Sequence, residues 1–250
     1  MHLRRILIPL LAALLLTALP VPSRAQEATV LWFPKEPLYR MVDGRPGGLL
    51  LPLAERILKE AGLEPKFVRM PLRRVLLTLR DGGRPDVLGL GWYYTPERAE
   101  WLRYSLPIYR DAQLVALVRR EDCRRYEAFG SFAELSAAPM LRVGVVDGYS
   151  YGPYLDGVLL DQGTRRVMAG EDGQLCGMLN ARRCDCIIGP QRHLEEDLLG
   201  RELPLERFAF LNYPDMPKGE PRYLVFTRET SEQTMERVNA AILKIVGDLR

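Results

Sequence analysis

The segment VLGLGWYYTPER, residues 87–98, places a strand directly before a helix and decides the fold class. Its first four residues, Val87 to Leu90, have the length and composition of a fully buried strand. Thr95 is a good N-cap and Pro96 a good first helical residue, so Arg98 falls in the first turn of a helix. A strand that leads into a helix is the building unit of α/β proteins.

Arg98 is unfavourable for that helix by itself. A cation in the first turn opposes the helix dipole, at a cost of a few tenths of a kcal/mol. A bound anion would offset this cost, because free backbone N–H groups and the forked guanidinium can converge on one carboxylate. Such charge-assisted bonds contribute roughly 1.5–3 kcal/mol each. The alternative is that Arg98 pairs with Glu97 or Glu100 on a solvated face.

Three aromatic residues, Trp92, Tyr93 and Tyr94, lie at the end of this strand, where α/β sheets bind ligands. Successive side chains of an extended run point to opposite sides, so Trp92 and Tyr93 cannot face one cleft equally. We expect one of them to line the cleft, as a flat surface for an apolar or cationic ligand group. At least one other should pack in the core.

The first 25 residues have the pattern of a secretory signal peptide. Arg4 and Arg5 precede an apolar run from Ile6 to Leu19, and Ser23-Arg24-Ala25 offers a small-residue cleavage site. The run is short for a membrane span, and an uncleaved anchor is the alternative. No later stretch is long and apolar enough to cross a bilayer, so we expect a soluble mature protein.

The charge of the chain gives no reason to expect nucleic acid or an anionic membrane as partner. The sequence holds 35 basic and 32 acidic residues, but Arg4, Arg5 and Arg24 belong to the leader. The mature chain is therefore about neutral.

Strand and helix patterns alternate along the rest of the chain. We expect strands at 30–32, 66–69, 87–90, 113–118, 141–146, 184–188, 208–211 and 222–226, with a turn at 43–44. Helices are expected to begin near 52, 71, 131, 153, 173, 190 and 231. Such alternation indicates α/β units with mainly parallel sheets.

Two joints divide this pattern into two lobes. The charged stretch 119–125 precedes a restart of the strand and helix pattern, and 213–221 is rich in Pro and Gly. We expect lobe 1 to hold 26–119 with 222–250, and lobe 2 to hold 120–221. Two lobes with two crossings form a hinge, and ligand pockets favour such interfaces.

Four cysteines in an exported chain permit disulfides. Cys184 and Cys186 would point the same way from one strand, which is a poor geometry for a bond between them, and Cys176 is a better partner for one of the two. Cys123 lies far away in sequence. Plain buried thiols are equally open, and a metal site from Cys176, Cys184, Asp185, Cys186 and His193 is a remote alternative.

Four segments together resemble bacterial extracellular solute-binding proteins of family 3. They are DGRPGGLLLPLAERILKEAGL (43–63), GGRPDVLGLGWYYTPERAEWLRYSLPIYRDAQLVALVRRED (82–122), VGVVDGYSYG (143–152) and RVNAAILKIVGDL (237–249). The resemblance covers nearly all of 27–250. It implies a two-lobed type II periplasmic-binding-protein fold, with a mainly parallel, helix-flanked sheet in each lobe. It also implies a monomer in the periplasm that passes a small ligand to the membrane permease of an ABC transporter, with no cofactor and no metal.

The resemblance assigns several ligand contacts. Arg98 stands where amino-acid binders of the family clamp the ligand carboxylate, and Gly91 and Tyr93 stand where they often present hydroxyl side chains. In the second lobe, Tyr149 and Ser150 take the place of donors to the same carboxylate.

Other candidates complete the expected site. Phe33 and Tyr39 follow the first strand, where the family commonly stacks an aromatic on its ligand. Tyr151 extends the cluster of aromatic and hydroxyl groups in the second lobe. Arg74 ends a Pro-x-x-Arg segment, Pro71 to Arg74, that resembles a divergent branch of the family.

Two departures from the family pattern bear on the ligand. Amino-acid binders usually carry an acidic residue shortly after the strand equivalent to 184–188, where it receives the ligand ammonium, but 189–192 here read GPQR. An acidic residue also commonly follows the glycine at 48, where this chain has Leu49 to Leu51. Amino-acid derivatives, aromatic acids and small peptides therefore suit the site about equally.

Two further function classes remain open. A few relatives of the fold are periplasmic dehydratases acting on cyclic carboxylates, and Asp147 and Glu171 are the candidate general acids for such a reaction. The chain has no HExxH motif, no P-loop and no Ser/His/Asp order, and His193 is the only histidine of the mature chain. A stand-alone ligand sensor is the other alternative, and a binding protein without enzymatic activity is the expectation.

Overall fold

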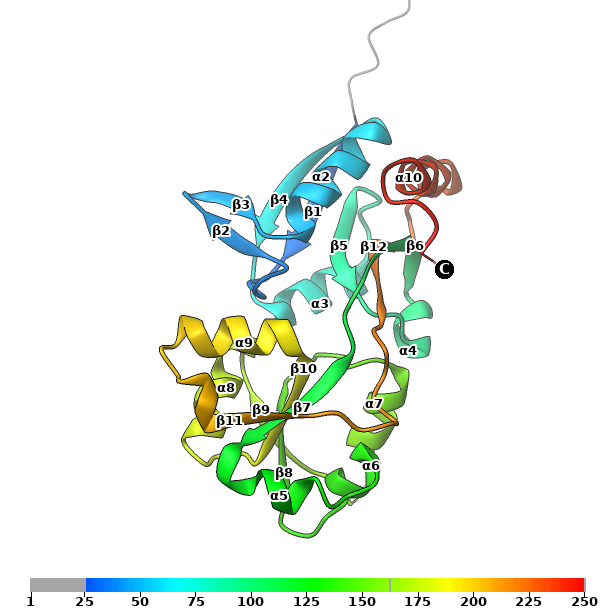
Figure 1. Cartoon of the computed structure of the whole chain (residues 1–250). Coiled ribbons are helices and arrows are strands. Elements are labelled where there is room, and N and C mark those ends of the chain that lie inside the picture. Colours follow the sequence, from blue (N-terminus) through cyan, green and yellow to red (C-terminus); the bar gives the residue numbers. More distant parts are fainter. Residues whose placement is uncertain (1–25, 162, 250) are drawn as a thin grey trace, which may run out of the picture.

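The computed structural model describes residues 26–161 and 163–249, so the expected signal peptide lies outside the described residues. Figure 1 shows two bodies of α/β structure, one above the other, joined by extended segments. Each body is built on a five-stranded sheet. The expected α/β fold with two lobes is therefore confirmed.

The first lobe has the strand order β4-β1-β5-β12-β6. Strands β4, β1 and β5 are parallel, and β12 runs antiparallel to both of its neighbours, β5 and β6. A small hairpin, β2–β3, turns at Asp43-Gly44 as expected. The elements are β1 (Gln26–Trp32), β2 (Arg40–Val42), β3 (Arg45–Gly47), α2 (Leu50–Glu60), β4 (Leu63–Arg69), α3 (Leu72–Asp81), β5 (Val87–Trp92), α4 (Pro96–Ala99), β6 (Leu102–Arg110), β12 (Pro221–Thr227) and α10 (Glu232–Ile245).

The second lobe has the strand order β11-β7-β10-β8-β9. Strands β10, β8 and β9 are parallel, and β7 is antiparallel to β10 and β11. The elements are β7 (Leu114–Arg119), η1 (Arg120–Asp122), α5 (Cys123–Tyr126), α6 (Phe132–Ser136), β8 (Arg142–Val146), α7 (Pro153–Leu160), β9 (Arg165–Ala169), η2 (Asp172–Gln174), α8 (Leu175–Asn180), β10 (Cys186–Pro190), α9 (Gln191–Gly200), η3 (Leu205–Arg207) and β11 (Phe208–Leu211).

The first crossing between the sheets differs from the expected one. Strand β7, which we assigned to lobe 1, pairs with β10 and β11 in the second sheet, and all its residues are buried there. The charged stretch 119–125 is therefore no linker, because it forms the end of β7, then η1 and the start of α5. The chain passes from the first sheet to the second at 111–113, and it returns between β11 and β12.

Two strands of the five-stranded sheets, like the two strands of the small hairpin, have no expected counterpart. Strand β9 lies at an edge of its sheet and is largely exposed, so it lacks an apolar pattern. Strand β6 is also an edge strand, and Pro107 interrupts its pattern. Helix α2 begins two residues before the expected Pro52, and β10 begins at Cys186 rather than at Cys184.

Local end signals explain several boundaries. The hydroxyl groups of Thr95, Ser131 and Ser231 accept hydrogen bonds from backbone N–H groups three residues later and cap α4, α6 and α10. Gly62 follows α2 with a φ of 75°, a conformation that glycine adopts without strain.

None of the four cysteines, all within the described residues, forms a disulfide, so the disulfide alternative is not realised. Cys176, Cys184 and Cys186 are buried in the core of lobe 2, and burial raises the pKa of Cys184 to about 11. Among the described residues, no group of three or more His, Cys, Asp or Glu side chains could hold a metal ion. Within the same residues, no helix is both long and apolar enough to cross a membrane.

Candidate ligand-binding site

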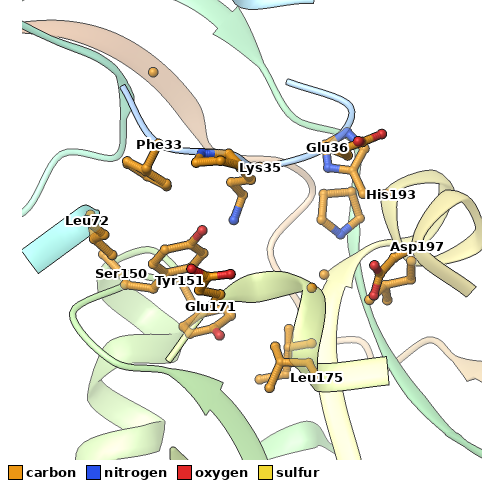
Figure 2. Close-up of a pocket in the computed structure, with 18 of the residues that line it drawn as sticks. Phe33, Lys35, Glu36, Leu72, Ser150, Tyr151, Glu171, Leu175, His193 and Asp197 are labelled. Atoms are coloured by element: carbon orange, nitrogen blue, oxygen red, sulfur yellow. The ribbon is translucent and has the colours of Figure 1, made fainter. Parts of the chain in front are cut away.

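A cavity of about 350 Å³ lies between the two lobes. It is in the size range of small-molecule sites, about 300–1,000 Å³. The parallel strands β1, β5, β8 and β10 end beside it, as expected for a ligand site in α/β sheets. Figure 2 shows the side chains of both lobes facing it. Residues of lobe 1 that line it include Phe33, Lys35, Glu36, Leu72, Gly91, Trp92, Tyr93, Arg98 and Arg222, and those of lobe 2 include Leu114, Tyr149, Ser150, Tyr151, Glu171, Ile188, His193, Asp197 and Arg201.

Arg98 lies between the lobes and is half-buried. Its Nη2 atom donates a hydrogen bond of 3.0 Å to the carbonyl oxygen of Gly148 in the second lobe. Its guanidinium also stacks on the Trp92 ring, with Cζ 4.9 Å from the ring centre. Burial lowers the pKa of Arg98, but an arginine stays charged in proteins. A fixed positive charge therefore lies at the mouth of the cleft.

The start of helix α4 offers fewer free backbone N–H groups to an anion than expected. The backbone N–H of Arg98 donates to the Thr95 hydroxyl at 3.2 Å, and α4 is only four residues long. The N–H that was expected to bind an anion is thus used by the cap. The backbone N–H of Arg98 is therefore not available to a ligand, whereas its guanidinium lies at the cavity.

The aromatic residues after β5 diverge as the strand geometry requires. Trp92 lies under Arg98, whereas the Tyr93 hydroxyl points toward Asp111 and Arg222 at the base of the lobe. Tyr94 is 44% exposed and packs on Tyr104, with ring centres 5.1 Å apart. Both Trp92 and Tyr93 line the cavity, but the Tyr93 hydroxyl is taken by protein partners.

Tyr39 does not line the cavity, contrary to expectation. It is buried, and its hydroxyl donates to the Leu90 carbonyl oxygen at 2.9 Å. A Cβ atom on Gly91 would lie 1.8 Å from this hydroxyl, and Gly91 has a φ of 69°. Tyr39 therefore packs against the end of β5. Its hydroxyl occupies the space that a side chain at position 91 would need, which explains the glycine there. Phe33, packed edge-on against Tyr39, does line the cavity.

Three predicted residues of the second lobe line the cavity, but two of them are bound internally. The Ser150 hydroxyl donates to Asp156, and the Tyr151 hydroxyl accepts from the backbone N–H of Val146. Tyr149 presents its ring, which lies 5.7 Å from the ring of Phe33 between centres. Lys35 lies over the same ring at 4.0 Å. The second lobe thus offers aromatic surface rather than free hydroxyl groups.

Arg74 is exposed and does not line the cavity. The residue of helix α3 that reaches the cavity is Leu72, two positions earlier. The neighbouring Arg73 forms an ion pair with Asp147 of the second lobe outside this cavity. Of the two candidate general acids, only Glu171 lines the cavity.

Charged and polar groups that sequence patterns did not assign to the ligand also face the cavity. Residues 189–192 carry no acidic side chain, but Asp197 of α9 lines the cavity, and Glu36 and Glu171 supply carboxylates from other segments. Lys35 points into the cavity, with Glu171 on its opposite side (Figure 2). Burial lowers the pKa of His193 to about 4, so its imidazole is neutral near pH 7. Lys35 and Glu36 gave no signal because they lie in a loop of unremarkable composition, whereas Glu171 and His193 had been considered only for other roles.

Arg222 lines the cavity and forms a buried ion pair with Asp111. Arg222 donates through Nε and Nη2 to the two carboxylate oxygens of Asp111, at 2.9 and 2.6 Å. Burial alone would raise the pKa of Asp111, but the guanidinium of Arg222 holds this pKa below its usual value. Arg222 is thus neutralised within the protein, and Arg98 is the more available cation for a ligand.

Comparison with known proteins gives a consistent result. The model of the bacterial extracellular solute-binding proteins, family 3, matches residues 32–249. No curated protein sequence matches the chain.

Several solved structures share the fold. An ancestral arginine-binding protein bound to arginine has a TM-score of 0.70 at 19% identity, over 90% of this chain and 94% of that one. The holo form of ArgBP from T. maritima has a TM-score of 0.69 at 17% identity, over 89% and 91%. The amino acid ABC transporter substrate-binding protein AbpA from Streptococcus pneumoniae, bound to L-arginine, has a TM-score of 0.67 at 21% identity, over 87% and 88%.

These relatives are binding proteins rather than enzymes. The family occurs outside the cytoplasmic membrane, in agreement with the export expected from the sequence. With two α/β lobes, a cavity between them and a family match over most of its length, the chain belongs to the bacterial extracellular solute-binding proteins of family 3.

Proposed function

We propose that this protein captures a small, amino-acid-like solute carrying a carboxylate and delivers it to the permease of an ABC transporter. It would do so in the periplasm, as a monomer. The observation that carries the proposal is the position of Arg98, a fixed cation between the lobes that lines the cavity. A forked guanidinium matches a carboxylate in shape and charge.

We propose Arg98, Trp92, Phe33 and Tyr149 as direct ligand contacts. The rings of Phe33 and Tyr149 lie close together, one from each lobe, so a ligand between the lobes would meet aromatic surface from both. Gly91 would contribute close backbone approach, because it carries no side chain at the cavity wall.

A second, positively charged group on the solute would suit the carboxylates of the cavity. Glu36, Glu171 and Asp197 line the cavity, and any of them could receive that group in place of the acidic residue missing at 189–192. The similar structures of ancestral and S. pneumoniae proteins hold arginine, which carries both a carboxylate and a cation. A basic α-amino acid therefore enters the set of candidate ligands, although the sequence disfavoured it.

The lobes of this binding unit would divide at the crossings between the two sheets. We propose that lobe 1 comprises 26–111 with 221–249 and that lobe 2 comprises the sheet from β7 to β11, 114–211. Two contacts already join the lobes, one between Arg98 and Gly148 and one between Phe33 and Tyr149. Both would stabilise the closed arrangement of the lobes.

A ligand panel tests the proposal. Thermal shift is measured with the twenty L-amino acids, ornithine, and aromatic and hydroxy acids, because saturating ligand at a hundred times its dissociation constant stabilises the fold by about 2.7 kcal/mol. The expected result is stabilisation by a carboxylate-bearing solute that the amide or ester of the same solute does not give. Equal stabilisation by the acid and its ester would contradict the carboxylate clamp.

A further inference from the structure

Asp111 and Arg222 occupy the places where the chain passes between the lobes. Asp111 follows β6 at the start of the first crossing, and Arg222 is the second residue of β12, directly after the second crossing. They are 3% and 6% exposed, which is rare for charged side chains outside a functional or structural pairing. The pair therefore joins the two connections on the side of the first lobe.

The same guanidinium also holds the end of β5. Its Nη1 atom donates to the carbonyl oxygen of Gly91 at 2.7 Å, and its Nη2 atom contacts the Tyr93 hydroxyl at 3.1 Å. The hydroxyl of Tyr93 in turn donates to Asp111, and its ring lies 4.3 Å below the guanidinium carbon. Every nitrogen of the Arg222 guanidinium is thus bonded, to Asp111 or to the cavity wall.

Backbone contacts bring the two connections into direct contact. The N–H of Asp111 donates to the Glu220 carbonyl oxygen at 3.0 Å, and that of Leu114 donates to Pro217 at 3.1 Å. Gly219 passes so close that a Cβ atom there would lie 2.0 Å from the Asp111 carbonyl oxygen. The ion pair and these bonds make a single packed junction out of three segments distant in sequence.

We propose that Asp111 and Arg222 are positioning residues that fix the Gly91–Tyr93 wall of the cavity to both interlobe connections. Separating a buried, bidentate ion pair leaves an uncompensated charge and is strongly unfavourable. The junction therefore moves as part of lobe 1, and rotation of lobe 2 is confined to connecting residues outside the junction. The wall keeps its shape while the lobes move.

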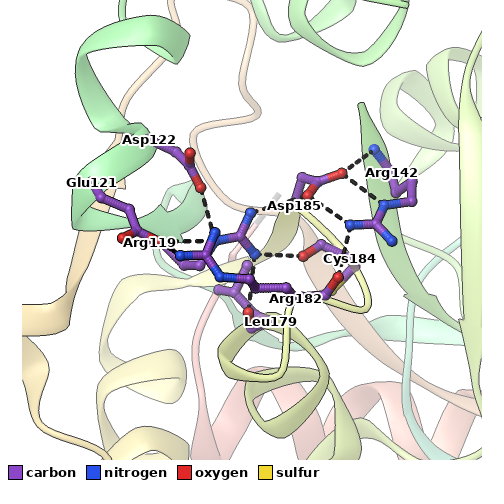
Figure 3. Close-up of polar contacts among 8 residues, drawn as sticks. All are labelled: Arg119, Glu121, Asp122, Arg142, Leu179, Arg182, Cys184 and Asp185. Atoms are coloured by element: carbon purple, nitrogen blue, oxygen red, sulfur yellow. Dashed lines mark hydrogen bonds and ion pairs between the residues drawn. The ribbon is translucent and has the colours of Figure 1, made fainter. Parts of the chain in front are cut away.

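The second lobe supplies a matched control. Arg119 and Asp185 form another buried pair, 8% and 9% exposed, with Nη2 to Oδ1 at 3.0 Å. Figure 3 shows this pair joined to Arg142, Asp122 and the carbonyl groups of Leu179 and Cys184. Neither Arg119 nor Asp185 lines the cavity. Loss of the Arg119–Asp185 pair should destabilise the protein without changing the cavity wall at Gly91–Tyr93.

Hydrogen–deuterium exchange of the ligand-free protein tests the proposal, independently of which solute binds. In Asp111→Asn and Arg222→Lys, peptides covering 88–96 should exchange at least about tenfold faster than in the wild type. In Asp185→Asn, faster exchange should be confined to peptides near 142 and 179–186. Unchanged exchange of 88–96 in Arg222→Lys would overturn the proposal, because lysine keeps the charge and loses only the fork.

A second variant keeps the test decisive if Asp111→Asn does not fold. Tyr93→Phe leaves the ion pair intact and removes one of its two links to the wall, the other being the bond from Arg222 to the Gly91 carbonyl oxygen, so the melting temperature should fall less than in Asp111→Asn. Exchange of 88–96 should still rise. Faster exchange throughout lobe 1, rather than at 88–96, would show a purely structural pair and overturn the positioning role.

Discussion

Replacing Arg98 with methionine removes the guanidinium from the cleft and keeps most of the apolar volume of the side chain. The variant loses the contact with Gly148 and the stacking on Trp92. The capping bond of α4 survives, because it uses the backbone N–H of residue 98. We therefore expect the free energy of unfolding to change by less than about 1 kcal/mol.

Ligand binding should respond much more strongly. Two charge-assisted bonds from a guanidinium to a carboxylate contribute about 3–6 kcal/mol together, and giving up the charge-assisted bond to the Gly148 carbonyl offsets about 1.5–3 kcal/mol of this. The net loss is about 1.5–3 kcal/mol, which corresponds to a Kd roughly 10- to 150-fold higher. Arg98→Lys, which keeps the charge and loses the fork, should fall in between.

Isothermal titration calorimetry with the carboxylate that gives the largest thermal shift measures these differences. Arg74→Met is the matched control, because Arg74 is an exposed arginine in the same lobe that does not line the cavity. It should bind as the wild type does. A Kd for Arg98→Met within threefold of the wild-type value would refute the assignment of Arg98 as the anion clamp.

Three other outcomes follow from the described geometry. Gly91→Ala should lower the melting temperature by several degrees and weaken binding, because its methyl group would overlap the Tyr39 hydroxyl; Gly91→Ala combined with Tyr39→Phe should recover part of the stability. Burial lowers the pKa of His193 in the folded state to about 4 from an ordinary 6.5, so the free energy of unfolding should fall as pH decreases from about 6.5 to 4. In His193→Gln, a plot of melting temperature against pH should be flatter over this range. A thiol reagent should modify Cys123 quickly and the three buried cysteines only after unfolding, giving four reactive thiols in total without a reductant; fewer than four would indicate a disulfide.

The sequence was sufficient for the features that depend on short-range patterns. The buried run before Thr95, the cap and the following proline place Arg98 in the first turn of a helix that follows a strand, and that edge of the sheet meets the cavity in the structure. The starts of the helices at Ser131 and Ser231 were predicted from equally local signals. These signals are interactions between residues a few positions apart, so they are visible without the fold.

Long-range pairing was not visible in the same way. Arg222 reaches the cavity because β12 pairs antiparallel with β5, which sets residue 222 beside Gly91. The sheet that takes β7 depends on β10 and β11, not on the residues of β7 itself. Tyr93 and Ser150 line the cavity, but their hydroxyl groups bind Asp111 and Asp156, and no sequence motif predicts these partners.

The position of β12 between β5 and β6 has a consequence for how the protein matures after export. A chain that emerges from its N-terminus brings out both neighbours of this strand long before the strand itself, leaving two unsatisfied sheet edges that invite misassociation. The contiguous second lobe can become compact meanwhile. The last thirty or so residues would then complete the fold of lobe 1. Their removal by a protease would unfold the whole of lobe 1 instead of only shortening the chain.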